Sequence, residues 1–267
     1  MRVLVALDLD QTVVFSRRSA GEAGPSVVVE QRDGEQLSSM TVGAIMAYGE
    51  LAGRHTVVPV TTRTVAQYSR IHLPAAARYA VCANGGVLLV DGERDPSWAD
   101  AVAQRCRVAA PLADVEARLR VVEGEPWVRL VRTAEGLFAY LVAQNRADVP
   151  KSWLAALAAD LAPLGWAVSM QGRKVYAVPQ ALSKAAAVRH LLDLLGADLL
   201  LAAGDSLLDQ PMLELAAATG GAAIRPAHGE LHDLGWMGAH VTAASGARAG
   251  EELLRWLSVQ ADARGRG

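Results

Sequence analysis

Short apolar runs alternate with longer amphipathic stretches over the first third of the chain. Three of these runs are typical of strands buried in a parallel sheet: 2–8, 56–60 (TVVPV) and 79–83 (YAVCA). Ser38 or Ser39 is predicted to cap a helix that ends near Gly53. A second, short helix is predicted from about Thr64. This alternation predicts the βα units of an open α/β sheet.

A hairpin is predicted between the first strand and the first helix. The segment 27–36 (VVVEQRDGEQ) has β-branched residues on one side of Asp33-Gly34, a dipeptide that favours a tight two-residue turn. The hairpin would form a flap that follows the loop after the first strand.

The pattern changes from about Trp98. The expected order is helix, two strands, helix, two strands, at 98–120, 127–132, 136–143, Pro150 to about Leu164, 166–170 and 174–178. Alternation of strand and helix then returns, at 184–195, 198–203, 208–218 and 221–224. A C-terminal helix is predicted last, because Leu253, Leu254 and Leu257 share one helix face. An α+β segment therefore interrupts an α/β core.

Two acids follow the first predicted strand. Asp8 and Asp10 stand at the end of RVLVALDLDQT, where ligands bind in open α/β sheets. Residues two apart in a strand point to the same side, and two buried carboxylates there are unfavourable unless a cation meets them. The pair therefore predicts a metal site or a reaction.

Four short motifs in chain order resemble those of the haloacid dehalogenase-like phosphohydrolases. They are D-x-D-x-T (Asp8, Asp10, Thr12), Thr61 after VVPV, Lys184 at the start of SKAAAVRHLLDLL, and GDSLLD at 204–209 after DLLLAA. An α-β-β-α-β-β insertion between the second and third motifs is similar to the class IIB cap of that superfamily. Its members include sucrose-phosphate phosphatase and the Cof-type sugar phosphatases.

The resemblance implies a fold and a division into domains. It implies an α/β, Rossmann-like core with a mostly parallel sheet and helices on both faces, formed by residues 1–88 and 180–267. Residues 89–179 would form the α+β cap. Asn84 and Gly85 match the N-G-G turn that precedes the cap in many members.

The resemblance also implies residue roles. Asp8 would attack phosphorus and form an aspartyl-phosphate, Asp10 would act as general acid and base, and Thr61 and Lys184 would contact the phosphoryl group. Mg²⁺ would be bound by the side chains of Asp8 and Asp205 and by the backbone carbonyl of Asp10. Asp209 would lie close by, either as a further ligand or as a residue that contacts a ligand. Predicted substrate contacts complete the set: Thr12, Thr62, Arg63, Asn84, Gly85, Lys151 and Lys174.

Charge supports a cation in such a site. A phosphate monoester brings nearly two negative charges toward Asp8, and each pair of unit charges near 4 Å costs roughly 4 kcal/mol at an effective dielectric of 20. Lys184 fits this need, since the chain has only three lysines against 23 arginines. A lysine at a helix start is unfavourable by about 0.3 to 1 kcal/mol, which a merely structural residue would tend to avoid.

Other side-chain patterns have plainer interpretations. His228 and His232 are spaced to share a helix face, but HGELH is not H-E-x-x-H and has no evident third ligand for zinc. Trp127, Trp153 and Trp166 are expected to pack inside the inserted segment. Thr12 and Ser206 have two open interpretations, a catalytic contact or hydrogen bonds to local backbone.

Composition bounds the class of protein. The 267 residues are 52% apolar, enough for a packed core, and a net charge of −2 favours neither nucleic acid nor anionic membranes as a partner. Cys82 and Cys106 are expected to be reduced thiols, and the N-terminus has neither a signal-peptide nor a membrane-spanning pattern. We therefore expect a cytoplasmic protein whose partner is a small phosphorylated metabolite. The sequence does not predict its oligomeric state.

Three functions are compatible with these residues. The first is a magnesium-dependent phosphatase for a sugar or polyol phosphate, the second a phosphotransferase or mutase, and the third a non-catalytic phosphate-binding module. The intact acids and lysine favour catalysis over binding alone. Two departures from the family pattern, Thr62 in TTR and Leu208 in GDSLLD, are expected to alter metal affinity or substrate range and to leave hydrolysis intact.

Overall fold

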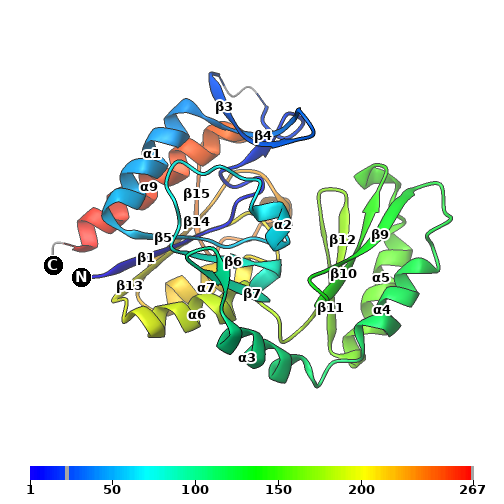
Figure 1. The fold of residues 1–267 in the computed structure, drawn as a ribbon. Coiled ribbons are helices and arrows are strands. Elements are labelled where there is room, and N and C mark those ends of the chain that lie inside the picture. Colours follow the sequence, from blue (N-terminus) through cyan, green and yellow to red (C-terminus); the bar gives the residue numbers. More distant parts are fainter. Residues whose placement is uncertain (22–23, 266–267) are drawn as a thin grey trace. The chain divides into compact units, whose positions relative to one another are not determined.

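The computed structural model describes residues 1–21 and 24–265. Its contacts divide the chain into two compact units, Met1–Asp95 with Lys184–Gly267, and Pro96–Ser183 (Figure 1). The second unit is the segment predicted as the insertion, with bounds a few residues later than expected.

A five-stranded parallel sheet forms the centre of the first unit. Its order is β15-β14-β13-β1-β5, with bounds His240–Val241, Ala222–Arg225, Leu199–Ala203, Val3–Leu7 and Thr56–Pro59. All five residues of β1 are buried, because the strand lies in the middle of the sheet and is covered on both faces. The predicted α/β fold with a parallel sheet is confirmed.

Helices cover both faces of this sheet (Figure 1). One face carries α1 (Val42–Arg54) and α9 (Ala247–Gly265), and the other carries α6 (Lys184–Leu195) and α7 (Gln210–Ala218). The predicted face of the C-terminal helix is correct, since Leu253, Leu254 and Leu257 are fully buried in the core cluster with the side chains of β1. The short helices are α2 (Val65–Tyr68), α8 (Glu230–Asp233) and a 3-10 turn at Ala83–Gly85.

The predicted hairpin forms a small antiparallel sheet. Strands β3 (Ser26–Arg32) and β4 (Glu35–Thr41) pair, and β2 (Phe15–Ser16) joins the other edge of β4. Asp33 and Gly34 have positive φ angles of 52° and 78°, as a type I′ turn requires. The turn prediction is confirmed.

The strand predicted at 79–83 has unexpected neighbours. It forms β6 (Tyr79–Cys82), which pairs antiparallel with β7 (Val87–Val90), and β7 pairs in turn with β8 (Glu93–Arg94). A single parallel bridge between Val60 and Val81 links it to the chain after β5. The hairpin return was not predicted, because the buried run VLLV follows a glycine turn without a polar break.

The predicted cap of the first helix was wrong. Ser38 and Ser39 lie in β4, and Thr41 is the N-cap of α1, with its hydroxyl accepting a hydrogen bond from the N–H of Ala44 at 3.0 Å. The strand runs further than the polar residues suggested, because Met40 and Thr41 are buried and still paired with β3.

Replacement of the observed cap, Thr41→Ala, is expected to lower the free energy of unfolding by about 1 kcal/mol. The variant leaves one orphan amide at the start of α1 and also removes the hydrogen bond to Glu251 at 3.1 Å. Urea unfolding measures the change, and Ser39→Ala is the control, because Ser39 lies within β4. Equal losses in the two variants would contradict the cap assignment.

The second unit is an α+β sandwich. Its antiparallel sheet has the order β11-β12-β10-β9, with bounds Trp166–Gln171, Lys174–Pro179, Phe138–Ala143 and Val128–Ala134. Helices α4 (Leu112–Arg120) and α5 (Lys151–Leu161) pack against this sheet. Short 3-10 turns lie at Arg146–Asp148 and Ala162–Leu164. The predicted order of helices and strands is correct except at the first helix.

The helix predicted over 98–120 is two helices. They are α3 (Pro96–Cys106) and α4, separated by residues 107–111, and Pro111 occupies the N-cap position of α4. Pro111 prevents one continuous helix over this range, because a proline disfavours helical geometry in the residue before it, here Ala110. The tryptophans pack as expected, with Trp127 edge-on to Trp153 at 5.0 Å and Trp166 buried.

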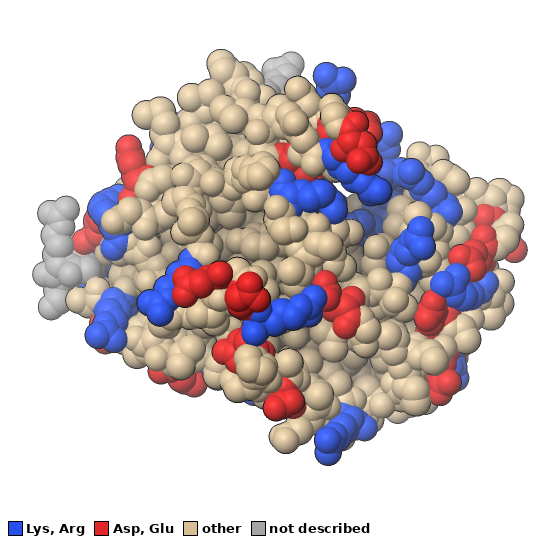
Figure 2. Space-filling model, viewed as in Figure 1, with Lys and Arg blue, Asp and Glu red and all other residues tan. Residues whose placement is uncertain are grey.

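The face of the molecule shown in Figure 2 carries charges of both signs. Figure 2 shows acidic and basic side chains together on the face that it presents, in keeping with the net charge of −2. Among the described residues, no helix combines the length and the apolar content needed to cross a membrane.

Candidate active site

The first acidic residue of the site follows β1 directly. The backbone N–H of Asp8 donates to the carbonyl of Ala203 in β13 at 3.0 Å, which fixes the residue at the carboxyl end of the sheet. The chain then turns sharply, with Gln11 at φ 62° and the N–H of Thr12 donating to the carbonyl of Leu9. Thr12 Oγ1 donates to Asp8 Oδ2 at 2.8 Å. The threonine therefore orients the carboxylate, in addition to holding the loop.

Lys184 is the first residue of α6, and its side chain is buried. Its Nζ donates to Asp8 Oδ1 and to Asp209 Oδ1, both at 2.5 Å. The lysine thus joins residues that are 176 and 25 positions away in the chain. Two carboxylates offset the unfavourable position of a cation at a helix start.

The loop after β13 is closed by one of its own acids. Asp209 Oδ2 accepts hydrogen bonds from the N–H of Asp205 at 3.2 Å, the N–H of Ser206 at 3.0 Å and the Ser206 hydroxyl at 2.6 Å. A Cβ on Gly204 would lie 2.4 Å from that of Asp209, so the loop can close only with glycine there. Asp209 therefore orders the loop and holds Lys184.

Three buried carboxylates meet at this point. Oxygens of Asp8, Asp205 and Asp209 lie within 4.8 Å of one another, and among the described residues they form the only such group of acidic, histidine or cysteine side chains. Lys184 balances one charge, so two negative charges remain if all three acids are ionised. Hard divalent cations prefer oxygen ligands of this kind, and the residues therefore fit Mg²⁺.

The electrostatics follow from this crowding. Burial, then the charge of Asp209, raises the pKa of Asp8 to about 7. Burial and the charges of Asp8 and Asp209 raise the pKa of Asp205 well above its ordinary value. Burial lowers the pKa of Lys184, but Asp209 and Asp8 outweigh burial and raise it. Without a divalent ion, Asp8 and Asp205 therefore take up protons more readily than ordinary carboxylates. Binding of a divalent ion would displace these protons.

The second motif lies at the end of β5. Thr61 is buried, and its hydroxyl accepts a hydrogen bond from the N–H of Arg63 at 3.1 Å, so it can still donate its own proton. Its carbonyl accepts the N–H of Asn84 at 3.0 Å. Asn84 and Gly85 have φ angles of 55° and 96°. This turn brings the ends of β5 and β6 together.

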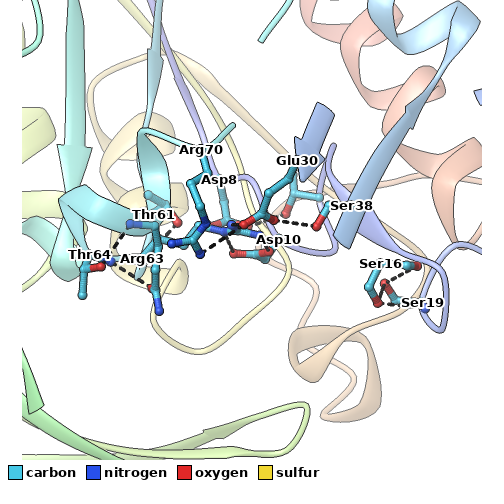
Figure 3. Close-up of polar contacts among 12 residues, drawn as sticks. Asp8, Asp10, Ser16, Ser19, Glu30, Ser38, Thr61, Arg63, Thr64 and Arg70 are labelled. Carbon is cyan, nitrogen blue, oxygen red and sulfur yellow. Dashed lines mark hydrogen bonds and ion pairs between the residues drawn. The ribbon is translucent and has the colours of Figure 1, made fainter. Parts of the chain in front are cut away.

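Asp10 has a partner that the sequence did not reveal. The Nε and Nη2 atoms of Arg63 donate to Asp10 Oδ2 and Oδ1 at 2.8 and 2.7 Å, a bidentate ion pair (Figure 3). The Asp10 carboxylate is half-exposed and is not a member of the acidic group around Lys184. Arg63, predicted to bind substrate, therefore holds the predicted acid and base.

The remaining predicted residues have fewer described contacts. Thr62 is half-buried beside Thr61. Lys151 opens α5 and is exposed, and Lys174 lies over the rings of Tyr140 and Tyr176 at 5.7 and 6.0 Å. Both lysines belong to the unit Pro96–Ser183, and their contact with substrate stays a prediction.

The predicted shared helix face of the two histidines was wrong. His228 precedes α8, because Gly229 has a φ of 86° and the helix begins only at Glu230. His228 Nδ1 accepts the N–H of Gly246, so Nε2 carries the proton toward the carbonyl of Gln11, and burial lowers the pKa of His228. Its role is to support the loop after β1.

Sequence reasoning missed two charged residues near Asp10. Glu30 is buried, and its Oε1 lies 2.8 Å from Arg63 Nη1 and 3.3 Å from Arg70 Nη2 (Figure 3). The one available signal was a carboxylate within the apolar run VVVE. That signal is weak, because glutamate at a strand end is ordinarily solvated.

The comparisons with known proteins rest on structure. No protein-family model matches the chain, and no curated protein matches it. The sucrose-phosphatase of Synechocystis, solved with sucrose and phosphate, superimposes with a TM-score of 0.65 at 16% identity, over 97% of this chain and 99% of that one. A Thermoplasma acidophilum protein gives 0.64 at 15% identity, over 97% and 99%. A HAD subclass IIB sugar phosphatase gives 0.61 at 10% identity, over 97% and 100%.

These similarities establish the fold. The chain has the same fold as these structures, which include a HAD subclass IIB sugar phosphatase. The fold that the sequence motifs implied is thereby confirmed.

Proposed function

We propose that this protein is a magnesium-dependent phosphatase that hydrolyses a small phosphate monoester, a sugar or polyol phosphate, through an aspartyl-phosphate. One observation carries the proposal: the Asp8 carboxylate is buried and held by Lys184 and Thr12, beside Asp205 and Asp209. A buried acid trio with one lysine is poorly suited to stabilising a fold. It suits a site that receives a cation and a phosphate.

The residues support two half-reactions. In the first, Asp8 attacks phosphorus, the bond from phosphorus to the ester oxygen breaks, and the leaving oxygen takes a proton from Asp10. In the second, water attacks the phosphorus of the aspartyl-phosphate while Asp10 takes its proton, which releases phosphate and restores Asp8. Lys184 and the Thr61 hydroxyl stabilise the phosphoryl oxygens.

The metal has a defined place in this proposal. Asp8 and Asp205 are the side chains proposed to bind Mg²⁺, together with the carbonyl of Asp10, while Asp209 orders the loop behind them. When bound, Mg²⁺ supplies charge neutralisation for the phosphoryl group. The hydrogen bonds support this division of roles. Asp209 accepts from Lys184, from the Ser206 hydroxyl and from the N–H groups of Asp205 and Ser206, whereas Asp8 accepts from Lys184 and Thr12.

The test is release of inorganic phosphate from a panel of sugar, polyol and nucleotide monophosphates. We expect turnover with Mg²⁺ and a loss of about 10²-fold or more in EDTA, because uncompensated charge keeps the ester from Asp8. A readout independent of activity is a melting temperature that rises with Mg²⁺ concentration. Transfer to a second hydroxyl without phosphate release would favour a phosphotransferase. No Mg²⁺-dependent reaction on any ester would overturn the proposal.

A further inference from the structure

Arg63 connects the candidate site to the β3–β4 hairpin. Its Nε and Nη2 atoms hold Asp10, while Nη1 lies 2.8 Å from Oε1 of Glu30 (Figure 3). The side chains of Arg63 and Glu30 are only 11% and 3% exposed. The guanidinium is planar, so carboxylates on two of its edges fix both its position and its rotation.

Glu30 is itself firmly held. Its Oε2 accepts a hydrogen bond from the Ser38 hydroxyl at 2.9 Å, and its Oε1 also accepts from Arg70 at 3.3 Å. Burial of a carboxylate is unfavourable unless it is paired and hydrogen-bonded, and these three partners meet that requirement. Glu30 therefore acts as a rigid anchor on the hairpin.

The hairpin is attached to the core at Glu30 and at its neighbour Val29. The register of β3 against β4 shifts on either side of this residue, and an isolated bridge pairs Glu30 with Ile71. The N–H of His72 donates to the carbonyl of Val29 at 2.7 Å. The irregular strand places the carboxylate toward Arg63, and backbone bonds keep it there.

We propose that Glu30 is a positioning residue for the phosphoryl-transfer reaction, acting through Arg63 to aim the Asp10 carboxyl group, which gives up the proton, at the leaving oxygen. This inference rests on the proposed function, in which Asp10 moves the proton. Without Glu30, the guanidinium keeps its contact with Asp10 but loses the fixed point on its other edge. Asp10 and Arg63 can then move as a pair.

The consequence depends on the leaving group. An alkoxide is a poor leaving group and needs the proton of Asp10, whereas 4-nitrophenolate leaves with little help. Misplacement of Asp10 should therefore slow an alkyl phosphate far more than 4-nitrophenyl phosphate. General damage to the fold, to Mg²⁺ binding or to the phosphate cradle would slow both esters alike.

The experiment compares Glu30→Gln with Glu35→Gln on the two esters. Glu35→Gln makes the same chemical change on the same hairpin, but the side chain of Glu35 is exposed. We expect Glu30→Gln to lower kcat on an alkyl phosphate by about 10²-fold, with kcat on the nitrophenyl ester within about threefold and KM little changed. Glu35→Gln should match the unmodified protein on both.

A double variant tests whether the effect passes through Arg63. Added to Arg63→Met, Glu30→Gln should produce no further loss on the alkyl ester, because both changes break the same connection. Additive losses would overturn the inference. If Glu30→Gln fails to fold, Glu30→Asp replaces it, since it keeps the buried charge and withdraws it from Arg63 by one methylene.

The two proposals fail in different ways. The proposed function requires that the protein hydrolyse at least one of the two esters and that Asp8→Asn abolish this hydrolysis. If no such hydrolysis is found, the proposed function and this inference are both overturned. With such turnover present, equal losses on both esters in the Glu30 variant would overturn the inference alone.

Discussion

Lys184→Met should lower the free energy of unfolding by about 3 to 5 kcal/mol at pH 8 in the absence of divalent metal. The reason is that Asp8 and Asp209 would remain buried without the ammonium group that now donates to both. Methionine fills most of the volume, so the loss is electrostatic and not a cavity effect. Urea unfolding in EDTA measures it.

The pH dependence separates charge from packing. At pH 5 Asp8 can take up a proton in the folded state, because its pKa is already raised to about 7 in the presence of the lysine. The penalty of Lys184→Met should therefore be smaller at pH 5 than at pH 8. Lys151→Met is the control, since Lys151 also opens a helix but is exposed. A loss that is the same at both pH values would contradict the electrostatic explanation.

The pairing of Lys184 with buried acids could be anticipated from its position in the sequence. A cation at a helix start is unfavourable by about 0.3 to 1 kcal/mol, which predicts that something stronger holds it. Two buried carboxylates supply that interaction. Asp8 and Asp205 could be expected to meet for a similar reason, because parallel strands β1 and β13 are neighbours and end at one edge of the sheet.

The link from Asp10 to Glu30 could not be predicted in the same way. Val29 is buried, and strict alternation along β3 would therefore place Glu30 toward solvent. The register shifts next to Glu30 break that alternation and bury both residues. A bulge leaves little trace in a single sequence, so the partner of Arg63 became visible only with the fold.

Local backbone geometry explains the other errors. The spacing of His228 and His232 fits a helix, but Gly229 at φ 86° starts the helix after the first histidine. The first helix is capped by Thr41 and not by Ser38 or Ser39, because strand pairing continues through those serines. The first error came from the left-handed conformation of one glycine, and the second from pairing with a neighbouring strand, which outweighed the local capping preference of the serines.

Asp8→Asn should abolish turnover, with a loss of about 10⁴-fold or more, and should at the same time make the metal-free protein more stable at pH 8. The first effect follows because an amide cannot form the aspartyl-phosphate. The second follows from the raised pKa of Asp8, about 7 against an ordinary 3.8. Below pH 3.8 Asp8 is protonated in both the folded and the unfolded protein. As the pH rises from 3.8 to about 7, Asp8 releases its proton in the unfolded protein but keeps it in the folded protein, so the folded protein loses stability over this range.

The geometry allows the amide to replace the carboxylate without disruption. Its oxygen can accept from Lys184, and its NH₂ can donate to the Thr12 hydroxyl, which now donates to Asp8. Melting curves in EDTA at pH 5 and pH 8 should therefore show a smaller drop with pH in Asp8→Asn than in the unmodified protein. Asp193→Asn makes the same change at an exposed position on α6 and should alter neither activity nor the pH profile.

Mg²⁺ should reverse the order of stability. A divalent ion that binds the folded protein more tightly than the unfolded protein stabilises the folded state. In the Asp8→Asn variant a neutral amide replaces one carboxylate, so the ion would be bound by one fewer negative charge. Saturating Mg²⁺ at pH 8 should then raise the melting temperature of the unmodified protein more than that of Asp8→Asn. If the variant gained as much from Mg²⁺ as the unmodified protein, Asp8 would not be a ligand. Phosphate release by the variant at the unmodified rate would remove Asp8 as the nucleophile, because an amide at this position cannot carry the phosphoryl group.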